Sequence, residues 1–304
     1  MNRSLLLLLG LFSFCQTARA VVVASGGPNN TAPSGQPYFN NIGTLNGASA
    51  IYLDNGWVLT ANHVASSLPA SVKFGGIDYT TEAGSFNRLT NSDPLDSTYT
   101  DMVLFRLSAP PALTSLSIAS STPTVGSPVM MIGNGRTQES TPTYWNRTVN
   151  PGSNNDAWVQ TTLPLSNISG FKTNPTNEIR WGVNDVAANN VDINVGSLLA
   201  PIDVISFLTQ FDQSAYLNEA QAVSGDSGGG AFSFNGSSWE LSGMMYAVST
   251  YETQPGGSTT AVYGSQTAIS DLSYYRSQIL TIIPEPSSLV FALCGGVVLC
   301  RRRR

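Results

Sequence analysis

The sequence is built from short apolar runs separated by turn-forming residues, and this pattern constrains the fold more than any other feature. Each run is rich in β-branched or apolar residues and is bounded by Gly, Asn or Asp, as is typical of strands joined by tight turns. The tripeptide Asp54-Asn55-Gly56 predicts a hairpin turn between the first two runs. We predict strands at Ala48–Leu53, Trp57–Thr60, Ser71–Phe74, Met102–Leu107, Val129–Ile132, Ala157–Thr162, Ala231–Phe234, Trp239–Met245 and Thr260–Tyr263.

One helix is predicted near the end of the chain. Ser270 or Asp271 can begin it, and apolar side chains recur along one face. These side chains are Ile269, Leu272, Tyr274, Tyr275, Ile279 and Ile283. The Pro- and Ser-rich stretch Ala109–Pro128 is predicted to be a linker, and Trp145–Asn155 and Asn184–Asn194 to be loops. Many short strands with one late helix predict an all-β barrel or sandwich.

The composition narrows the classes of function. The three cysteines lie near the two ends of the chain, so the body between Val21 and Ile283 has no disulfide and must rely on the size of its core. Only 11% of the residues are charged, the net charge is −5, and no basic patch is present, which makes nucleic-acid binding an unfavoured function. A single histidine excludes a multi-histidine metal site.

The first 20 residues have the organisation of a secretory signal peptide. Arg3 is followed by an apolar run from Leu5 to Phe14, and Ala18-Arg19-Ala20 forms a small-x-small cleavage site. Cleavage there would leave Val21 as the new N-terminus. The alternative is a buried N-terminal helix.

Three motifs predict nucleophilic catalysis by serine. Ser227 lies in Gly225-Asp226-Ser227-Gly228-Gly229, His63 follows an apolar strand, and Asp101 leads into one. Such chemistry needs a hydroxyl nucleophile, a base that takes its proton and a carboxylate that orients the base. The amides of Gly225 and Ser227 could stabilise the oxyanion. Asp93 and Asp96 are rivals for the carboxylate, but neither leads directly into a strand.

The order His, Asp, Ser within these motifs resembles the chymotrypsin/trypsin family of serine endopeptidases. The resemblance extends to the strand that begins at Trp239 and to the late helix. It implies two six-stranded antiparallel β-barrels, at residues about 36–115 and 125–265, within a protease domain of residues 21–283 that ends in a helix at about 270–283. The triad would lie between the barrels. A protein or peptide substrate would be cleaved through an acyl-enzyme intermediate, without a cofactor or metal.

The same resemblance implies a substrate pocket and an activation step. Gln221 would lie at the base of the pocket, with Met245, Tyr246 and Ala247 along its wall. A glutamine there argues against selection of Arg or Lys, although Glu219 is close enough to reverse that inference if the alignment shifts. The cysteine that usually follows the histidine motif is absent. A freed Val21 would pair with Asp226, so that removal of the signal peptide itself matures the enzyme. The alternative is that Val21 begins a disordered lead-in.

The C-terminal tail, residues 284–304, begins Pro284-Glu285-Pro286 and continues through an apolar run, Leu289–Cys300, to four arginines. The apolar run is shorter than the ~20 residues of a comfortable helical span. The tail resembles the PEP-CTERM sorting signal of Gram-negative bacteria, which implies recognition by an exosortase. The alternative is a short membrane anchor, residues 287–300, a transmembrane helix with arginines on the cytoplasmic side. Both readings predict an exported protein of the periplasm, cell surface or extracellular matrix.

Two other functions stay open at this point. One is a surface or biofilm-matrix protein on a protease scaffold with weak or no turnover, because a fold does not determine function. The other is calcium binding by Asn184–Asn194, for which Asp185 and Asp192 supply few acidic ligands.

Overall fold

The computed structural model describes residues 21–91, 98–152, 155–195, 202–213 and 216–283, and most of its regular structure is β-strand. The predicted class, all-β with a C-terminal helix, is confirmed. The predicted signal peptide, residues 1–20, and the predicted sorting tail, residues 284–304, lie outside the described residues.

The first half of the chain forms a curved antiparallel sheet of seven strands, not the six expected. In spatial order the strands are β6 (Ile77–Thr80), β5 (Ser71–Phe74), β2 (Ile42–Leu45), β3 (Ala48–Tyr52), β4 (Trp57–Ala61), β8 (Tyr99–Arg106) and β7 (Asn87–Thr90). An isolated bridge between Thr81 and Leu107 draws the end of β6 toward the end of β8, so the sheet curls without a continuous closing ladder. Strands β5 and β6 form a short hairpin that turns at Gly75-Gly76.

The second half contains a closed barrel of six strands, as expected. Around the barrel they are β14 (Arg180–Asn194), β15 (Asp203–Gln210), β20 (Gln266–Asp271), β18 (Trp239–Ser249), β17 (Gly230–Phe234) and β9 (Pro128–Gly133). Buried aliphatic and aromatic side chains such as Val129, Met131 and Phe207 fill it.

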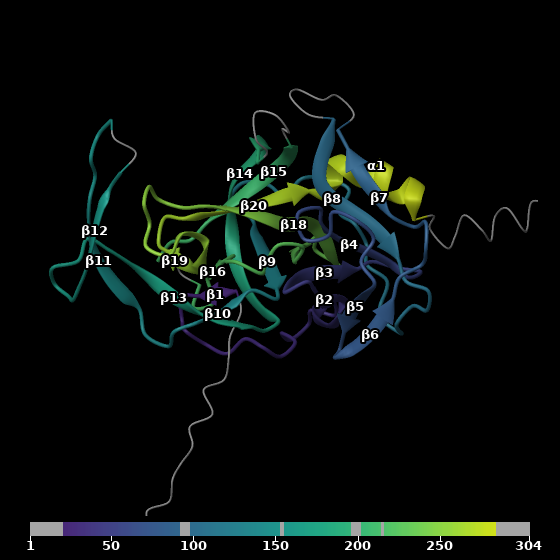
Figure 1. The fold of residues 1–304 in the computed structure, drawn as a ribbon, viewed down its shortest axis with the longest axis horizontal. Helices are drawn as coiled ribbons and strands as arrows, with labels where there is room; N and C mark the ends of the chain where they lie inside the picture. The colour runs from purple at the N-terminus through teal and green to yellow at the C-terminus, as the bar shows by residue number, and fades with distance from the viewer. Residues whose placement is uncertain (1–20, 92–97, 153–154, 196–201, 214–215, 284–304) are drawn as a thin grey trace, which may run out of the picture.

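Two smaller sheets join the barrel. One contains β10 (Arg136–Gln138), β13 (Ile168–Asn177), β11 (Thr143–Thr148) and β12 (Ala157–Thr161), with β19 (Thr260–Val262) paired to β13. Figure 1 shows the β11–β12 hairpin projecting away from the rest of the molecule. The other joins β1 (Val22–Val23), at the start of the described chain, to β16 (Ala220–Gln221).

Helix α1 (Leu272–Ile282) begins where the sequence predicts, and Asp271 caps it by accepting a hydrogen bond from the Ser273 amide at 2.9 Å. Leu272, Tyr275 and Ile279 are its buried residues. Two members of the predicted apolar face are wrong: Ile269 belongs to β20, and Tyr274 is exposed. Single-turn 3-10 helices also occur at Phe39–Asn41 and Gly257–Thr259.

The sequence predicts the hairpin turn correctly but misses strands that are rich in polar residues. Asn55 and Gly56 both have positive φ (49° and 87°), so the Asp54-Asn55-Gly56 turn between β3 and β4 is confirmed. The predicted loop Asn184–Asn194 is wrong, because it forms most of β14. The predicted loop Trp145–Asn155 is wrong only at its start, because β11 extends to Thr148 and the described residues that follow lie outside the strands. Asn184 is buried inside the fold, where its side-chain amide donates to the carbonyls of Gln210 and Ala220. This polar side chain therefore links β14 to β15 and β16.

Candidate active site

Two neighbouring strands bring His63 and Asp101 together. Strands β4 and β8 are antiparallel partners, with Ala61 opposite Met102, so the residue two positions beyond β4 lies beside Asp101 in β8. The Nδ1 atom of His63 is 2.6 Å from Oδ2 of Asp101, and the His63 backbone amide donates to Oδ1 at 2.9 Å. Both carboxylate oxygens therefore fix one histidine.

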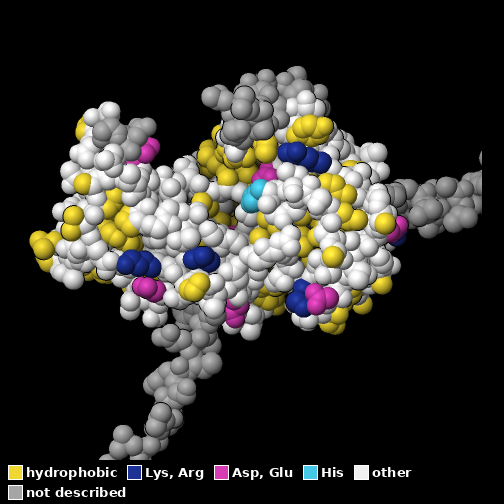
Figure 2. All heavy atoms as spheres, in the orientation of Figure 1, with side chains coloured by type: hydrophobic (Ala, Val, Ile, Leu, Met, Phe, Trp, Pro, Cys, Tyr) yellow, Lys and Arg dark blue, Asp and Glu magenta, His cyan; other side chains and the backbone are white. Residues whose placement is uncertain are grey.

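The two side chains differ in exposure. The Asp101 side chain is 3% exposed, whereas that of His63 is 48% exposed, and Figure 2 shows the imidazole at the surface. An ionised carboxylate can only accept hydrogen bonds, so Nδ1–H is the donor and Nε2 is left without this proton. This tautomer leaves Nε2 able to accept a proton from a nucleophile.

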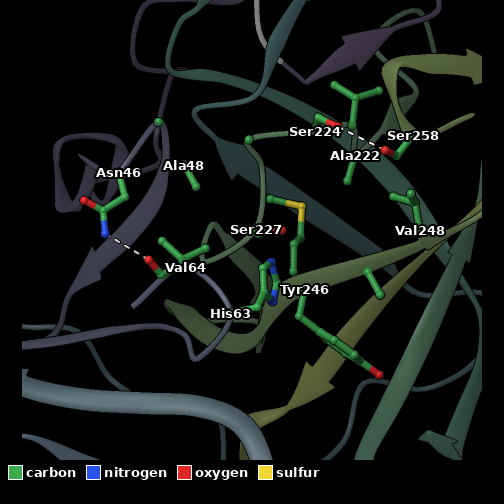
Figure 3. A pocket seen from close by; sticks show the side chains of 15 residues that line it. Asn46, Ala48, His63, Val64, Ala222, Ser224, Ser227, Tyr246, Val248 and Ser258 are labelled. Carbon is green, nitrogen blue, oxygen red and sulfur yellow. Dashed lines mark hydrogen bonds between the residues drawn. The ribbon is translucent and has the colours of Figure 1, made fainter. Parts of the chain in front are cut away.

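Ser227 lies in a tight turn between β16 and β17 and lines the same pocket as His63. The pocket has a volume of about 630 Å³ and lies between the first sheet and the barrel, and Figure 3 shows the serine and the imidazole within it. Gly228 has a φ of +83°, and a Cβ atom there would be 2.1 Å from the carbonyl oxygen of Ser49. Only glycine fits this left-handed, tightly packed position.

The predicted oxyanion donors lie at the pocket wall. Gly225 and Ser227 both line the pocket, and within the described residues neither backbone amide donates a hydrogen bond. The amide of Arg136 donates to the Ser224 carbonyl at 2.9 Å. Because carbonyl and N–H point in opposite directions across a trans peptide, this contact directs the Gly225 N–H away from Arg136.

Asp226 points away from the pocket into the barrel and is fully buried. Its oxygens accept the amides of Gly135 at 2.8 Å and Val223 at 2.9 Å. Burial raises the pKa of Asp226 to about 7, while these amides, the charge of Arg180 and the Val21 backbone amide act in the opposite direction. The structure therefore brings Val21 to Asp226, the two residues predicted to pair.

A buried arginine and a glutamine hold the segment that begins at Val21. Arg180 donates to the carbonyls of Val21 at 2.9 Å and Pro28 at 2.7 Å, and also to that of Gly27. Gln138 binds both the amide and the carbonyl of Val23, at 2.7 and 2.9 Å. Neither Arg180 nor Gln138 was predicted from the sequence. Both side chains bond to backbone groups of the segment, which are the same for every residue type, so no local sequence motif identifies them.

Three of the four predicted pocket residues line the pocket: Met245, Tyr246 and Ala247. Gln221 is not among its lining residues, because its side chain is 1% exposed and donates to the Gln266 carbonyl at 3.2 Å. Ala222, Val223 and Val248 line the pocket instead. Glu219 is also buried, away from the pocket lining, and burial is the main cause that raises its pKa to about 7.

The remaining acidic residues that the sequence suggested do not form a common site among the described residues. Asp93 and Asp96 lie outside the described residues. Asp185 and Asp192 lie on β14, where Asp185 accepts a hydrogen bond from the Tyr216 hydroxyl at 3.0 Å. Among the described residues, no group of three or more His, Cys, Asp or Glu side chains could hold a metal ion.

The architecture and a family model agree. The trypsin family model matches residues 25–162, which include His63 and Asp101 and end before Ser227. The structure is similar to that of neuropsin, a serine protease of mouse brain, with a TM-score of 0.50 and 17% identity over 84% of this chain and 98% of neuropsin. The fold is that of a trypsin-like serine protease.

A further match among solved structures is the inactive form of the Rv3671c protease from M. tuberculosis. Its TM-score is 0.46, with 13% identity over 83% of this chain and 99% of that chain. No curated protein matches the sequence. Within the part of the trypsin-like domain that the structure describes, no helix has the length and apolar character needed to cross a membrane.

Proposed function

We propose that the protein is a serine endopeptidase in which Ser227, His63 and Asp101 are the catalytic residues. The observation that carries the proposal is the bond from His63 Nδ1 to the buried Asp101 carboxylate, in a pocket that Ser227 also lines. A shared pocket would by itself be weak support for catalysis. A buried carboxylate that orients a half-exposed imidazole, however, is what a general base requires.

The reaction follows from these positions. Ser227 Oγ attacks the carbonyl carbon of a peptide bond while His63 Nε2 takes its proton, and the amides of Gly225 and Ser227 bind the oxyanion. His63 then gives the proton to the leaving amine, and the acyl group stays on Ser227. His63 then takes a proton from water, which attacks this ester, and gives that proton to Ser227 Oγ as the acid is released. Asp101 stabilises the imidazolium in both halves without taking the proton.

A fluorophosphonate probe tests the nucleophile. It should label the wild-type protein at Ser227 and should not label Ser227→Ala. Ser233→Ala is the matched control, because that hydroxyl lies in β17 and bonds to Ser242 away from the pocket. An unlabelled, folded wild type would reject the enzyme and favour a surface protein without turnover.

We propose that the residue before the cleaved bond is uncharged and aliphatic. The pocket wall between Ala222 and Val248 carries no acidic side chain, and Glu219 and Asp226 are buried behind it. Burying a lysine or arginine there without a partner would be costly. A peptide library should therefore show preference for aliphatic residues; preferred cleavage after Arg or Lys would contradict this.

We also propose that removal of residues 1–20 completes the site. A free amino group on Val21 would place a positive charge beside the buried Asp226 carboxylate, where the Val21 amide already donates. The pairing of β1 with β16 supports an ordered segment over a loose lead-in. A chain with one added alanine before Val21 should lose about 100-fold in kcat/KM relative to a chain that begins with Val21. Equal activity of the two chains would reject the activation step.

The location is a further proposal that rests on sequence alone. We propose export to the periplasm, cell surface or matrix of a Gram-negative bacterium, with the tail recognised by an exosortase. Until it is processed, the tail would contact the membrane. Intact mass of the protein from soluble and membrane fractions tests both ends: loss of residues 1–20 and of the tail is expected. A full-length tail in the membrane fraction would support the anchor instead.

A further inference from the structure

Ser49, in the first sheet, contacts the nucleophile loop, residues 222–229, which joins β16 to β17 and carries Ser227. It lies in β3 and is fully buried, so its side chain is out of reach of a substrate. Its hydroxyl donates to the Gly225 carbonyl at 3.0 Å and accepts the Asn134 amide at 2.7 Å. Its own backbone amide donates to the Ser227 carbonyl at 2.9 Å.

These contacts fall on the two residues whose amides are the proposed oxyanion donors. Ser49 holds the carbonyl of Gly225 through its side chain and that of Ser227 through its backbone. These carbonyls belong to the 225–226 and 227–228 peptides, so the 226–227 peptide, which carries the Ser227 amide, is held between them. The 224–225 peptide, which carries the Gly225 amide, is adjacent to the first of them. Gly225 needs such restraint most, because its φ is +98° and glycine has no side chain that limits its conformation.

The surrounding contacts keep Ser49 itself in place. The Thr60 hydroxyl donates to the Ser49 carbonyl at 2.7 Å. The side-chain amide of Asn134 donates to the Ala48 carbonyl at 3.2 Å, and that of Asn177 donates to the Asn134 carbonyl at 3.0 Å. One network of hydrogen bonds therefore joins the first sheet, the loop after β9 and the nucleophile loop.

From this geometry we infer that Ser49 is a positioning residue for the oxyanion hole. The inference rests on the proposed protease function and adds a residue from the other half of the molecule to it. Ser49 acts through Gly225 and Ser227 and does not touch the substrate. Loss of its hydroxyl leaves the Gly225 carbonyl and the Asn134 amide buried without this partner, which favours rotation about the backbone bonds of Gly225 and so displaces the flanking Gly225 and Ser227 amides from their orientation toward the oxyanion.

The predicted signature is a loss of transition-state binding with little loss of substrate binding. Removal of one oxyanion donor from a serine protease costs about 100- to 1,000-fold in kcat. Loosening a donor should cost less, so Ser49→Ala should lower kcat by about 10- to 100-fold while KM changes by less than about threefold. A peptide aldehyde, whose adduct places an oxyanion in the hole, should lose affinity by a similar factor.

The experiment compares Ser49→Ala with Ser242→Ala in the mature protein, with kcat, KM, aldehyde inhibition and thermal unfolding measured for each. Ser242 is equally buried, and its hydroxyl bonds to Ser233 in the barrel wall, so it controls for the loss of a buried hydroxyl. Ser49→Thr keeps the hydroxyl and should retain more of the wild-type kcat than Ser49→Ala.

Three outcomes would overturn the inference. The first is a kcat for Ser49→Ala within twofold of that for Ser242→Ala. The second is a lower kcat with unchanged aldehyde affinity. The third is a loss of activity that follows thermal stability equally in both serine variants. An inactive wild type would reject the proposed protease function, which is a different result from an active wild type that does not respond to Ser49→Ala.

Discussion

The two halves of the candidate active site are held in different ways. His63 and Asp101 are 38 positions apart and meet because β4 and β8 are paired neighbours in one sheet. The nucleophile loop depends on distant groups: Ser49 is 176 positions from Gly225, and Gly135 is 91 positions from Asp226. The acid–base pair therefore needs one strand register, whereas the nucleophile loop needs both halves of the domain and the start of the chain.

The largest expected effect on kcat comes from changes to the His63–Asp101 pair. Asp101→Asn keeps the shape of the side chain but removes the charge that stabilises the imidazolium and selects the tautomer, so kcat should fall by about 10,000-fold. His63→Ala should abolish measurable turnover, because the chain has no second imidazole.

Kinetics on a peptide substrate, with thermal unfolding of each variant, check this prediction. The His63 side chain is half exposed, so its replacement should leave the unfolding temperature nearly unchanged. If Asp101→Asn kept more than a tenth of the wild-type kcat, a local acid–base pair would no longer account for the site.

A smaller effect is expected in the pH dependence of stability, which should differ between a chain that begins at Val21 and a chain extended before Val21. The raised pKa of Asp226, about 7 against 3.8 for an ordinary aspartate, means that the folded state holds a proton that the unfolded chain releases as pH rises. In a chain whose Val21 nitrogen is still in a peptide bond, this contribution to stability is fully present below about pH 4 and is lost as pH rises through 7. A Val21 ammonium group lowers the pKa and reduces that loss.

Unfolding temperatures of the extended and mature chains between pH 4 and 8 test this. Glu219 has its pKa raised in the same direction, but it is present in both chains, so the difference between the curves isolates Asp226. Parallel curves would show that the amino group does not reach the carboxylate.

The smallest effect is expected at the pocket wall. Tyr246 is buried, and its hydroxyl shares a 2.8 Å hydrogen bond with Ser206 inside the barrel. Tyr246→Phe should lower the free energy of unfolding by about 1 kcal/mol and change kcat/KM by less than about threefold. Urea unfolding and kinetics measure the two quantities. A tenfold fall in kcat/KM would mean that this wall takes part in catalysis.

The sequence predicts the parts of this molecule that depend on local chemistry. Apolar runs with Gly, Asn or Asp at their ends became strands, and Asp271 caps the helix. The three motifs marked His63 and Ser227, which line one pocket, and Asp101, which is bonded to His63. Each of these signals lies within a few residues of the feature that it predicts.

Features that depend on long-range partners could not be predicted. Strand β14 contains Asn184 and other polar residues, and its strand pairing depends on β9 and β15. Gln221 was expected in the pocket, yet its partner Gln266 draws the side chain inside the barrel. Ser49 and Arg180 carry no motif, because their roles consist of hydrogen bonds to carbonyl groups far away in the sequence.

The pairing of β1 with β16 has a consequence for the order of folding. Val22 lies opposite Gln221, so the first described strand has no strand partner until the chain is available as far as residue 221. Contacts between such distant positions form late, because a long loop must close first. His63 and Asp101 can therefore come together through β4 and β8 before β1 pairs, whereas the segment that leads into Ser227 is completed last.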